Sequence, residues 1–235
     1  DQVFRPWAET APTRPALIGD GKVWTYGALS GIVDGTAAAL RSHGVRGGDR
    51  VMVVSENSLA LAGLVLAISA SDAWAVVVNP RLSEREVDQI RDHCGARLLY
   101  YAVEVSELAH AHARRHGARD VAIGELGTLG VSPINEAAVP EPVEAEGSAQ
   151  VAALLYTSGT TGNPKGVMLT HRNILFNASV SRELRRPTPD DVIYGVLPMS
   201  HIVGFSSILI GTLMGGSAVC LAPKYDPATF LDAVR

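Results

Sequence analysis

The sequence has 235 residues, of which 47% are hydrophobic and 19% are charged, and its formal net charge is −4. A chain of this length and composition can bury a large core, which is typical of an ordinary globular enzyme. Proteins that bind nucleic acid carry basic patches, whereas lysine and arginine are scattered among acidic residues here, so we expect no nucleic-acid partner.

The two cysteines and the first residues indicate a reducing compartment. Cys94 and Cys220 stand far apart without metal-ligand spacing, which favours two reduced, packed thiols over a disulfide. Residues 1–6 lack the basic and then apolar pattern of a secretory signal. We therefore expect a cytoplasmic protein. The apolar segment 59–70 is too short to span a membrane and predicts a buried helix followed by a strand.

Strand and helix patterns alternate along the chain, which predicts an α/β fold of layered, mostly parallel sheets flanked by helices. The Asp20-Gly21 pair favours an early hairpin. The spacing of Ser83 and Glu86 is that of a capping box, which predicts a helix that runs toward Cys94. The other elements expected in this part are helices over 26–41 and 105–116 and strands over 51–54 and 98–101.

The second half of the chain begins with a long acidic segment. Residues 124–148 contain three prolines and show no clear period, so we expect a surface connector. The elements expected after it are strands over 151–156, 167–169, 193–197 and 218–221, and helices over 172–185, 202–214 and 227–235.

Three histidines form a cluster in the helix expected over 105–116. His112 and His116 have the i,i+4 spacing that can bind a metal ion. No further metal-ligating residue stands at a matching distance, and the neighbouring arginines would repel a cation. We therefore expect His110, His112 and His116 to lie on a solvated helix face.

Residues 156–166 read Tyr-Thr-Ser-Gly-Thr-Thr-Gly-Asn-Pro-Lys-Gly and form the most informative segment of the chain. Glycines bring backbone N–H groups close to an anion, hydroxyls add donors or a magnesium contact, and the lysine offsets phosphate charge. The apolar run before this segment and Val167-Met168-Leu169 after it predict that it joins two strands. The segment therefore predicts a polyphosphate-binding loop.

Two other interpretations of this loop are less consistent with its residues. A Walker-type loop ends in Gly-Lys-Ser/Thr and opens into a helix, whereas Pro164-Lys165-Gly166 stands in that place and no hydroxyl residue follows the lysine. A plain polar surface turn would use the same residue types, because these are the ordinary residues of loops. The whole ordered string favours phosphate binding over both.

At these residues the chain resembles the adenylate-forming superfamily of acyl-CoA synthetases, peptide-synthetase adenylation domains and luciferases. The loop matches the phosphate-loop motif of that family along its whole length. Four further segments resemble family segments, so the similarity spans nearly the whole chain: Trp24-Thr25-Tyr26-Gly27-Ala28-Leu29, Gly48-Asp49-Arg50-Val51, Asn79-Pro80-Arg81-Leu82-Ser83 and Leu197-Pro198-Met199-Ser200-His201-Ile202-Val203-Gly204.

One pair of residues separates the branches of this family. Domains that activate amino acids usually carry an aromatic residue and an aspartate near the last segment, where the carboxylate meets the ammonium group of the substrate. This chain has Ser200-His201, which fits a CoA ligase for an uncharged acyl or aryl acid. Ser200 departs from the aromatic residue often found there, and a structural role for His201 stays an alternative.

The resemblance implies that ATP, with Mg²⁺, activates a carboxylic acid to an acyl-adenylate and pyrophosphate, and that coenzyme A then accepts the acyl group. It implies that Lys165, Thr160 and Thr161 are catalytic, Lys165 by balancing the charge of the departing pyrophosphate. Thr161 would contact Mg²⁺ through the phosphates, and His201 and Gly204 would border the acyl site. The residues implied in phosphate binding are Thr157, Ser158, Gly159, Thr160, Thr161, Gly162, Lys165 and Gly166.

Members of this family are longer, with a large N-terminal domain, a hinge and a small C-terminal domain. We find no adenine, ribose, hinge or C-terminal lysine segment of the family in residues 1–235, which predicts an incomplete N-terminal domain without the C-terminal domain. Within it, residues 45–185 would form one α/β subdomain that carries the loop, while 1–44 and 186–235 would contribute to a second sheet. We expect an inactive fragment of an acyl-CoA synthetase. The alternative is a naturally short, non-catalytic binding or regulatory protein with the same fold. The sequence leaves the oligomeric state open, and a homo-oligomer is one of the options.

Overall fold

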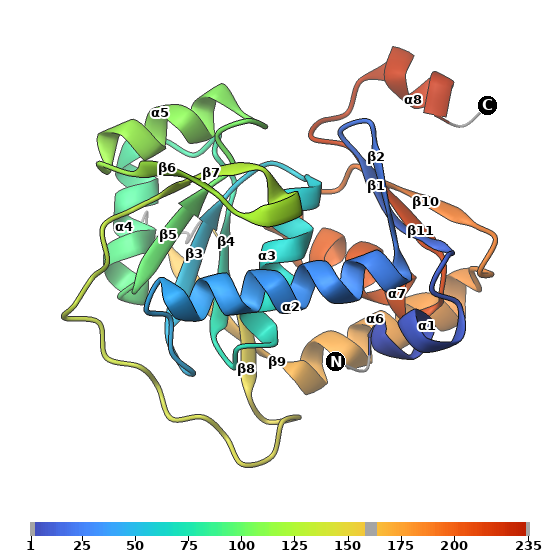
Figure 1. Cartoon of the computed structure of the whole chain (residues 1–235), viewed down its shortest axis with the longest axis horizontal. Coiled ribbons are helices and arrows are strands. Elements are labelled where there is room, and N and C mark those ends of the chain that lie inside the picture. The colour runs from blue at the N-terminus through green and yellow to red at the C-terminus, as the bar shows by residue number, and fades with distance from the viewer. Residues whose placement is uncertain (1–2, 158–163, 234–235) are drawn as a thin grey trace.

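The computed structural model describes residues 3–157 and 164–233. Its strands form a seven-stranded sheet in the order β6-β7-β5-β3-β4-β8-β9 and a four-stranded sheet in the order β10-β11-β1-β2, both flanked by helices (Figure 1). Strand pairing is parallel through the middle of the larger sheet and antiparallel toward its edges. The predicted layered α/β class is therefore confirmed.

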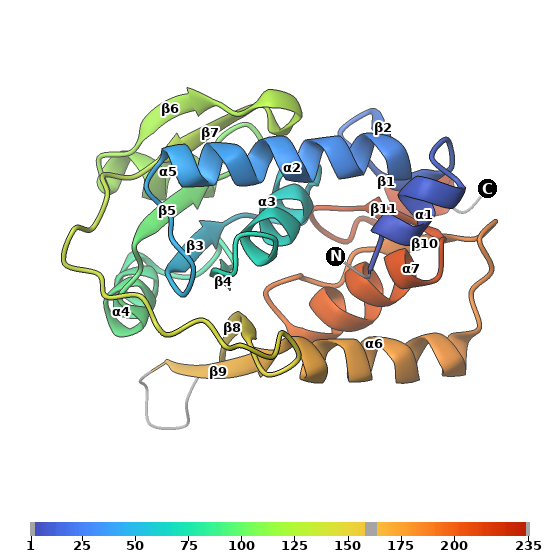
Figure 2. The ribbon, with the colours of Figure 1, turned by 60° about the horizontal axis from the view of Figure 1, so that its bottom comes forward.

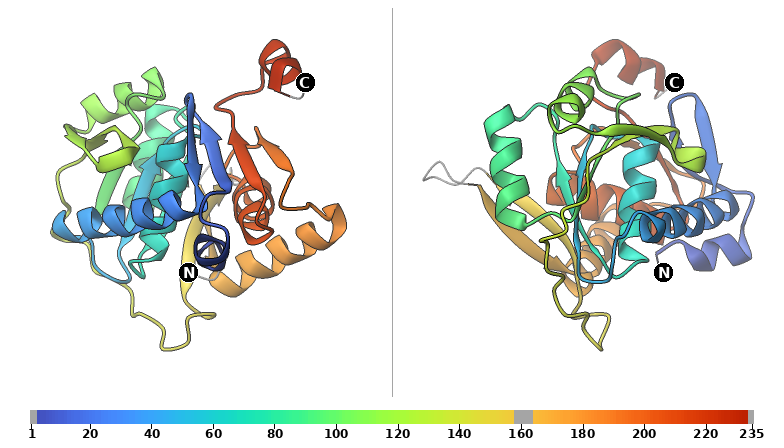
Figure 3. Two further views of the ribbon diagram at one scale, coloured as in Figure 1. Left: turned by 45° about the vertical axis from the view of Figure 1, so that its right-hand side comes forward. Right: turned by 60° about the vertical axis from the view of Figure 1, so that its left-hand side comes forward.

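Each sheet combines segments that lie far apart in the sequence. The smaller sheet joins an N-terminal hairpin to two strands near residue 200, and Figure 3 shows it facing the larger sheet. Its strands are β1 (Pro15–Gly19), β2 (Lys22–Thr25), β10 (Val192–Gly195) and β11 (Ala218–Leu221). Those of the larger sheet are β3 (Arg50–Val54), β4 (Trp74–Val78), β5 (Leu98–Tyr101), β6 (Arg119–Ala122), β7 (Thr128–Val131), β8 (Val151–Thr157) and β9 (Lys165–Thr170).

Helix α3 (Leu59–Ser69) occupies the centre of the molecule. It is apolar on all sides, every residue from Leu59 to Ile68 is buried, and it contacts β1 of one sheet and β3 and β4 of the other (Figure 2). A helix without a polar face is stable only where it is surrounded by protein or lipid. No helix of the described residues is long and apolar enough to cross a membrane.

The central strands are hydrophobic on both faces because helices cover both. Val51 and Val53 of β3 belong to the core around α3, whereas Met52 and Val54 pack on the opposite face with residues of α4 (Glu84–Cys94) and α5 (Glu107–Arg115). This double burial explains the continuous apolar runs in the sequence. The remaining helices are α1 (Arg5–Thr10), α2 (Tyr26–Ser42), α6 (His171–Arg185), α7 (Gly211–Met214) and α8 (Pro227–Ala233).

Local sequence signals match the structure at several turns. Asp20 and Gly21 have φ angles of 52° and 71°, as the tight turn between β1 and β2 requires. Ser83 and Glu86 form the predicted capping box at the start of α4. The predicted helix over 202–214 begins as a π-helix over Val203–Ile210 and continues as α7. The strand predicted over 193–197 ends at Gly195.

The prediction of a connector without regular structure over 124–148 is wrong for its first part. Residues Gly124–Leu126 form a 3₁₀ turn, and β7 comes after it and pairs antiparallel with both β5 and β6. A strand as short as β7, with four residues, leaves no clear period in the sequence. The four-residue strand β6 and the six-residue helix α1 are two further short elements that the sequence analysis does not predict. Pairing with a neighbouring strand, rather than local pattern, decides the conformation of such short segments.

Arginine side chains fix the path of the rest of this connector. Arg97 donates to the carbonyl oxygen of Asn135 at 2.8 Å, Arg46 to that of Ala138 at 3.0 Å, and Arg50 to that of Val139 at 2.8 Å. The carboxylate of Asp49, which is fully buried, pairs with Arg46 at 2.9 Å. Arg50 of the Gly-Asp-Arg-Val segment, together with Arg46 and Arg97, therefore holds the connector against the sheet.

Two of the three histidines, His112 in α5 and His116 directly after it, do not lie on the predicted solvated helix face. His112 is buried and its Nε2 lies 3.1 Å from the carbonyl oxygen of Pro80. His116 lies within hydrogen-bond distance of Tyr101 and of Asp88, which is also bound by Arg115. The prediction failed because α5 turns this side toward α4 and the sheet. No group of three metal-ligating side chains suited to a metal ion occurs in the described ranges.

We expect Gly48→Ala to destabilise the protein by about 2–4 kcal/mol. The φ angle of Gly48 is +78°, and an added Cβ would lie 1.8 Å from the carbonyl oxygen of Glu141 in the connector. Urea unfolding would measure the change. The matched control is Gly35→Ala in α2, where no heavy atom lies within 4 Å of an added Cβ. That substitution should stabilise the protein by about 0.5–1 kcal/mol, and an equal effect of both would contradict the prediction.

We expect Asp88→Asn to destabilise the protein by about 1 kcal/mol at neutral pH, after allowance for solvent screening. The hydrogen bond from Arg115 lowers the pKa of Asp88 to about 2. A depressed carboxyl pKa stabilises the fold above its ordinary value near 3.8, and this contribution is lost as the pH falls toward 2. Urea unfolding between pH 2 and 7 should show the two proteins converging in acid. Asp92→Asn is the control, because Asp92 is exposed and its side chain pairs only with Arg91 among the described residues. A pH-independent difference for Asp88→Asn would refute this account.

Candidate active site

The predicted phosphate loop joins β8 to β9, which confirms the predicted strand–loop–strand arrangement. The two strands pair antiparallel, with Thr157 opposite Lys165 and Tyr156 opposite Gly166. Thr157 and Lys165 are both exposed, and Lys165 has no acidic partner among the described residues. The loop residues Ser158, Gly159, Thr160, Thr161 and Gly162 lie outside the described residues. The described ends of the hairpin therefore present a hydroxyl and an unpaired ammonium group side by side.

Tyr156 and Gly166 pack against each other at the base of the loop, one on each strand of the hairpin. A Cβ on Gly166 would lie 2.7 Å from Cδ2 of Leu154 and 3.0 Å from Cζ of Tyr156, so a side chain there would have to displace one of these neighbours. The Tyr156 hydroxyl lies 2.7 Å from Nδ1 of His93 on α4. Burial raises the pKa of Tyr156, so its hydroxyl stays protonated at neutral pH. The tyrosine thus anchors the start of the loop to α4.

The parallel pairing of β4 with β8 determines what lies beside the loop. Val77 is paired with Leu155, so both strands end at the same edge of the sheet. Asn79 and Arg81 come after β4 there, and Glu56 comes after the neighbouring strand β3. Arg81 pairs with Glu56 at 2.9 Å. Ligands of open parallel sheets bind at the carboxyl ends of the strands, so this edge is the expected place for a site.

A cavity of about 470 Å³ opens at this edge between the two sheets. Its walls come from the segments after β3, β4, β10 and β11, which all end on this side. The lining residues include charged, amide and apolar side chains: Ser55, Glu56, Asn57, Asn79, Arg81, Val196, Leu197, Pro198, Met199, Ser200, Pro223, Lys224 and Tyr225. Such a mixture suits a small organic molecule with one polar end.

His201 and Gly204 stand just after the wall of this cavity without lining it themselves. The His201 N–H donates to the carbonyl oxygen of Pro198 at 3.0 Å, and its imidazole is exposed. Nδ1 of His201 accepts from the N–H of Val203 at 3.4 Å, which favours the tautomer with its proton on Nε2. A Cβ on Gly204 would lie 2.2 Å from the carbonyl oxygen of Pro198. Because Gly204 has no side chain, the first turn of the π-helix can lie in direct contact with the backbone of Pro198, which lines the cavity.

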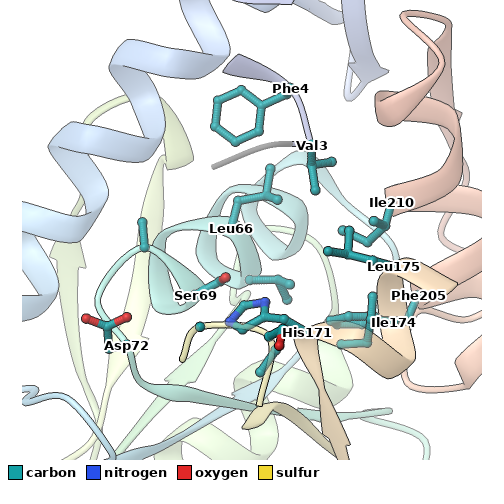
Figure 4. Close-up of a pocket in the computed structure, with 15 residues that line it drawn as sticks. Val3, Phe4, Leu66, Ser69, Asp72, His171, Ile174, Leu175, Phe205 and Ile210 are labelled. Carbon is teal, nitrogen blue, oxygen red and sulfur yellow. The ribbon is translucent and has the colours of Figure 1, made fainter. Parts of the chain in front are cut away.

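A second cavity, of about 580 Å³, lies at the other end of the sheet (Figure 4). It is lined by Ala152 at the start of β8 and by Asp72 just before β4, so it faces away from the phosphate loop. Figure 4 shows apolar side chains such as Phe4 and Leu66 on one side and His171 on the other. Burial lowers the pKa of His171. This cavity therefore lies at the amino ends of β4 and β8, whereas the candidate site lies at the carboxyl ends of β3 and β4.

Sequence reasoning missed several residues of the candidate site. Glu56, Asn57, Lys224 and Tyr225 line the cavity but were not singled out, and Arg81 was noted only within a segment that resembles the family. Their positions depend on strand pairing between distant segments. Two segments of the sequence point to this edge: Asn79-Pro80-Arg81, and Leu197-Pro198-Met199-Ser200, which lines the cavity.

Comparisons with known proteins agree with this geometry. The family described as AMP-binding enzyme matches residues 4–235. The chain belongs to the AMP-binding enzyme family. Its two-sheet architecture is that of the N-terminal part of adenylate-forming enzymes.

Curated relatives of the chain are CoA ligases. It is 32% identical over 233 residues to 4-coumarate–CoA ligase 3 from Oryza sativa subsp. japonica, covering 94% of this chain and 42% of that protein. It is 33% identical over 229 residues to a feruloyl-CoA synthase from Amycolatopsis sp, covering 97% of this chain and 45% of the relative. The chain thus spans less than half the length of these relatives.

Solved structures of the family superimpose on the chain. The o-succinylbenzoate CoA synthetase from Bacillus subtilis in complex with its acyl-adenylate intermediate matches with a TM-score of 0.78 and 28% identity, over 98% of this chain and 58% of that one. Apo MatB from Rhodopseudomonas palustris matches with a TM-score of 0.77 and 26% identity, over 98% and 46%.

We expect Tyr156→Phe to lower the free energy of unfolding by about 0.5–1 kcal/mol, because it removes one half-exposed hydrogen bond to His93 and keeps the ring. Urea unfolding would measure the change. Tyr225→Phe is the control, since the hydroxyl of Tyr225 has no hydrogen-bond partner in the described part of the chain. A Tyr156→Phe protein as stable as the control would show that the hydroxyl does not anchor the loop.

Proposed function

We propose that the protein containing this chain is an ATP-dependent acid–thiol ligase that converts an uncharged acyl or aryl acid into its CoA thioester. The observation that carries the proposal is the β8–β9 hairpin, which holds Thr157 and Lys165 opposite each other beside the carboxyl end of β4. The matched relatives are CoA ligases for aromatic acids, which supports this class of substrate.

In the first step, a carboxylate oxygen of the acid attacks the α-phosphorus of ATP. The bond to the bridging oxygen breaks and pyrophosphate leaves. The β- and γ-phosphates would be held by Thr157, Gly166 and Lys165 with Ser158, Gly159, Thr160, Thr161 and Gly162, and Lys165 would offset the charge that develops on pyrophosphate. Catalysis would then rest on charge stabilisation and positioning, with Lys165, Thr160 and Thr161 as catalytic residues.

The surroundings of Lys165 support this proposal. The exposed Lys165 ammonium has no carboxylate partner among the described residues, as an anion-binding group requires. Thr161 is the proposed protein contact for Mg²⁺, which would supply positive charge to neutralise the phosphates. In the second step the thiol of coenzyme A attacks the acyl carbonyl and AMP leaves.

We also propose that the acid binds in the 470 Å³ cavity, with His201 and Gly204 at its border. Ser200 and His201 place no carboxylate where an amino-acid substrate would need one. The wall residues Leu197, Pro198 and Met199 present apolar surface instead. In this proposal residues 45–185 form the α/β subdomain with the loop, and the segments on either side form the second sheet that completes the cavity.

The substrate class is tested by ATP–pyrophosphate exchange with the full-length protein. We expect exchange with 4-coumarate, ferulate or 3-hydroxybenzoate and none with phenylalanine. Equal exchange with phenylalanine would refute the assignment to uncharged acids.

We expect Lys165→Ala in the full-length protein to lower acid-dependent exchange by about 100-fold, because the only cation of the loop segment is lost. Lys22→Ala, which removes an exposed lysine of β2 in the other sheet, is the control and should exchange as wild type. An unchanged rate in Lys165→Ala would sink the proposed role of the loop.

A further inference from the structure

The side chain of Asn57 links the larger sheet to the chain that leaves the smaller sheet. Asn57 stands after β3, is 4% exposed, and lies 138 residues before Gly195 in the sequence. Its Nδ2 donates to the carbonyl oxygens of Gly195 at 3.0 Å and Leu197 at 2.9 Å. Its Oδ1 accepts from the N–H of Met199 at 2.9 Å. One buried amide thus binds three backbone groups of residues 195–199, the segment we call the cavity wall.

The backbone that carries Asn57 is itself held in place. The N–H of Ser55 donates to the carbonyl oxygen of Val78 at 3.1 Å, and the Ser58 hydroxyl caps α3 by accepting from the N–H of Leu61 at 3.1 Å. The hydroxyls of Ser55 and Ser58 lie 3.2 Å apart. The amide of Asn57 therefore starts from a rigid corner between β3, β4 and α3, which makes it a fixed reference for the cavity wall.

We propose that Asn57 is a positioning residue for the acid substrate, a role that rests on the proposed function. By fixing the cavity wall, it fixes the surface against which the acyl or aryl group lies. The same contact also fixes the start of the π-helix, since the carbonyl oxygen of Pro198 accepts from the His201 N–H and lies against Gly204. A displaced wall would therefore also displace His201 and Gly204.

The chemistry of the site requires an amide. Two carbonyl oxygens need two donors and the Met199 N–H needs an acceptor, and among short side chains only asparagine supplies both from one planar group. Aspartate has the same shape but no donor when ionised, so its carboxylate would face the Gly195 and Leu197 oxygens. The buried carboxylate would repel these two carbonyl oxygens, and the segment that carries them would move away.

The proposal predicts an effect on the acid and none on ATP. Asn57 has no hydrogen bond to the described residues of β8 or β9, whose ends would hold the phosphates. In ATP–pyrophosphate exchange by the full-length protein, we expect Asn57→Asp to raise KM for the acid about 10- to 100-fold and to leave KM for ATP within about 2-fold. A purely structural role would reduce the active fraction and leave both KM values unchanged.

The matched control is Gln150→Ala. Gln150 is another buried amide, 2% exposed, whose Oε1 accepts from the N–H of Glu144 at 2.8 Å near the start of β8, away from the cavity wall. This variant should keep both KM values. Equal rises of the two KM values in Asn57→Asp, or no rise in KM for the acid, would overturn the positioning role.

Hydrogen exchange tests the anchoring without requiring activity. In Asn57→Ala, amide exchange of residues 196–204 should become about 10-fold faster or more, because the Met199 N–H loses its acceptor, while Gln150→Ala should leave this segment unchanged. Unchanged exchange in Asn57→Ala would overturn the proposal at the structural level. Faster exchange in a protein that shows no acid-dependent activity with any acid would instead refute the proposed function and leave only the anchoring contact.

Discussion

The parallel pairing of β3, β4 and β8 is the constraint on which the rest of the structure depends. It sends the carboxyl ends of all three strands to one edge of the sheet, so that the end of β8, Asn79 after β4 and Asn57 after β3 lie at the same edge although their segments are separated in sequence. Parallel strands need long crossover connections, and the one between β3 and β4 is α3. Burial of α3 between the two sheets then holds the smaller sheet against this edge.

The two halves of the candidate site are therefore held by different parts of the fold. Phosphate binding is proposed for a hairpin of the larger sheet, anchored to α4 through Tyr156 and His93. The acid is proposed to lie against a wall that leaves the smaller sheet and is tied back to the larger one by Asn57. An interaction across the two sheets can thus change acid binding while leaving the phosphate hairpin intact.

The connector after β7 shows how buried charge can replace regular structure. Backbone carbonyl groups of an irregular segment need hydrogen-bond partners, and three arginines supply them: Arg50 of β3, Arg46 in the turn before β3 and Arg97 directly before β5. Asp49 is buried, and its charge is offset by Arg46, which is partly exposed. The family-like Gly-Asp-Arg-Val segment is thus explained by packing rather than by chemistry at the site.

The amino-acid sequence by itself determined the features that local patterns encode: the α/β class, the Asp20-Gly21 turn, the capping box of α4, the buried helix α3 and the strand–loop–strand form of the phosphate segment. These arise from φ preferences, capping groups and periodicity within a few residues. Only the tertiary structure decided the strands β6 and β7, the packing of His112 and His116, and the contacts of Asn57. Each of these depends on a partner distant in the chain, and Asn57 meets Gly195 only because two sheets are folded around α3.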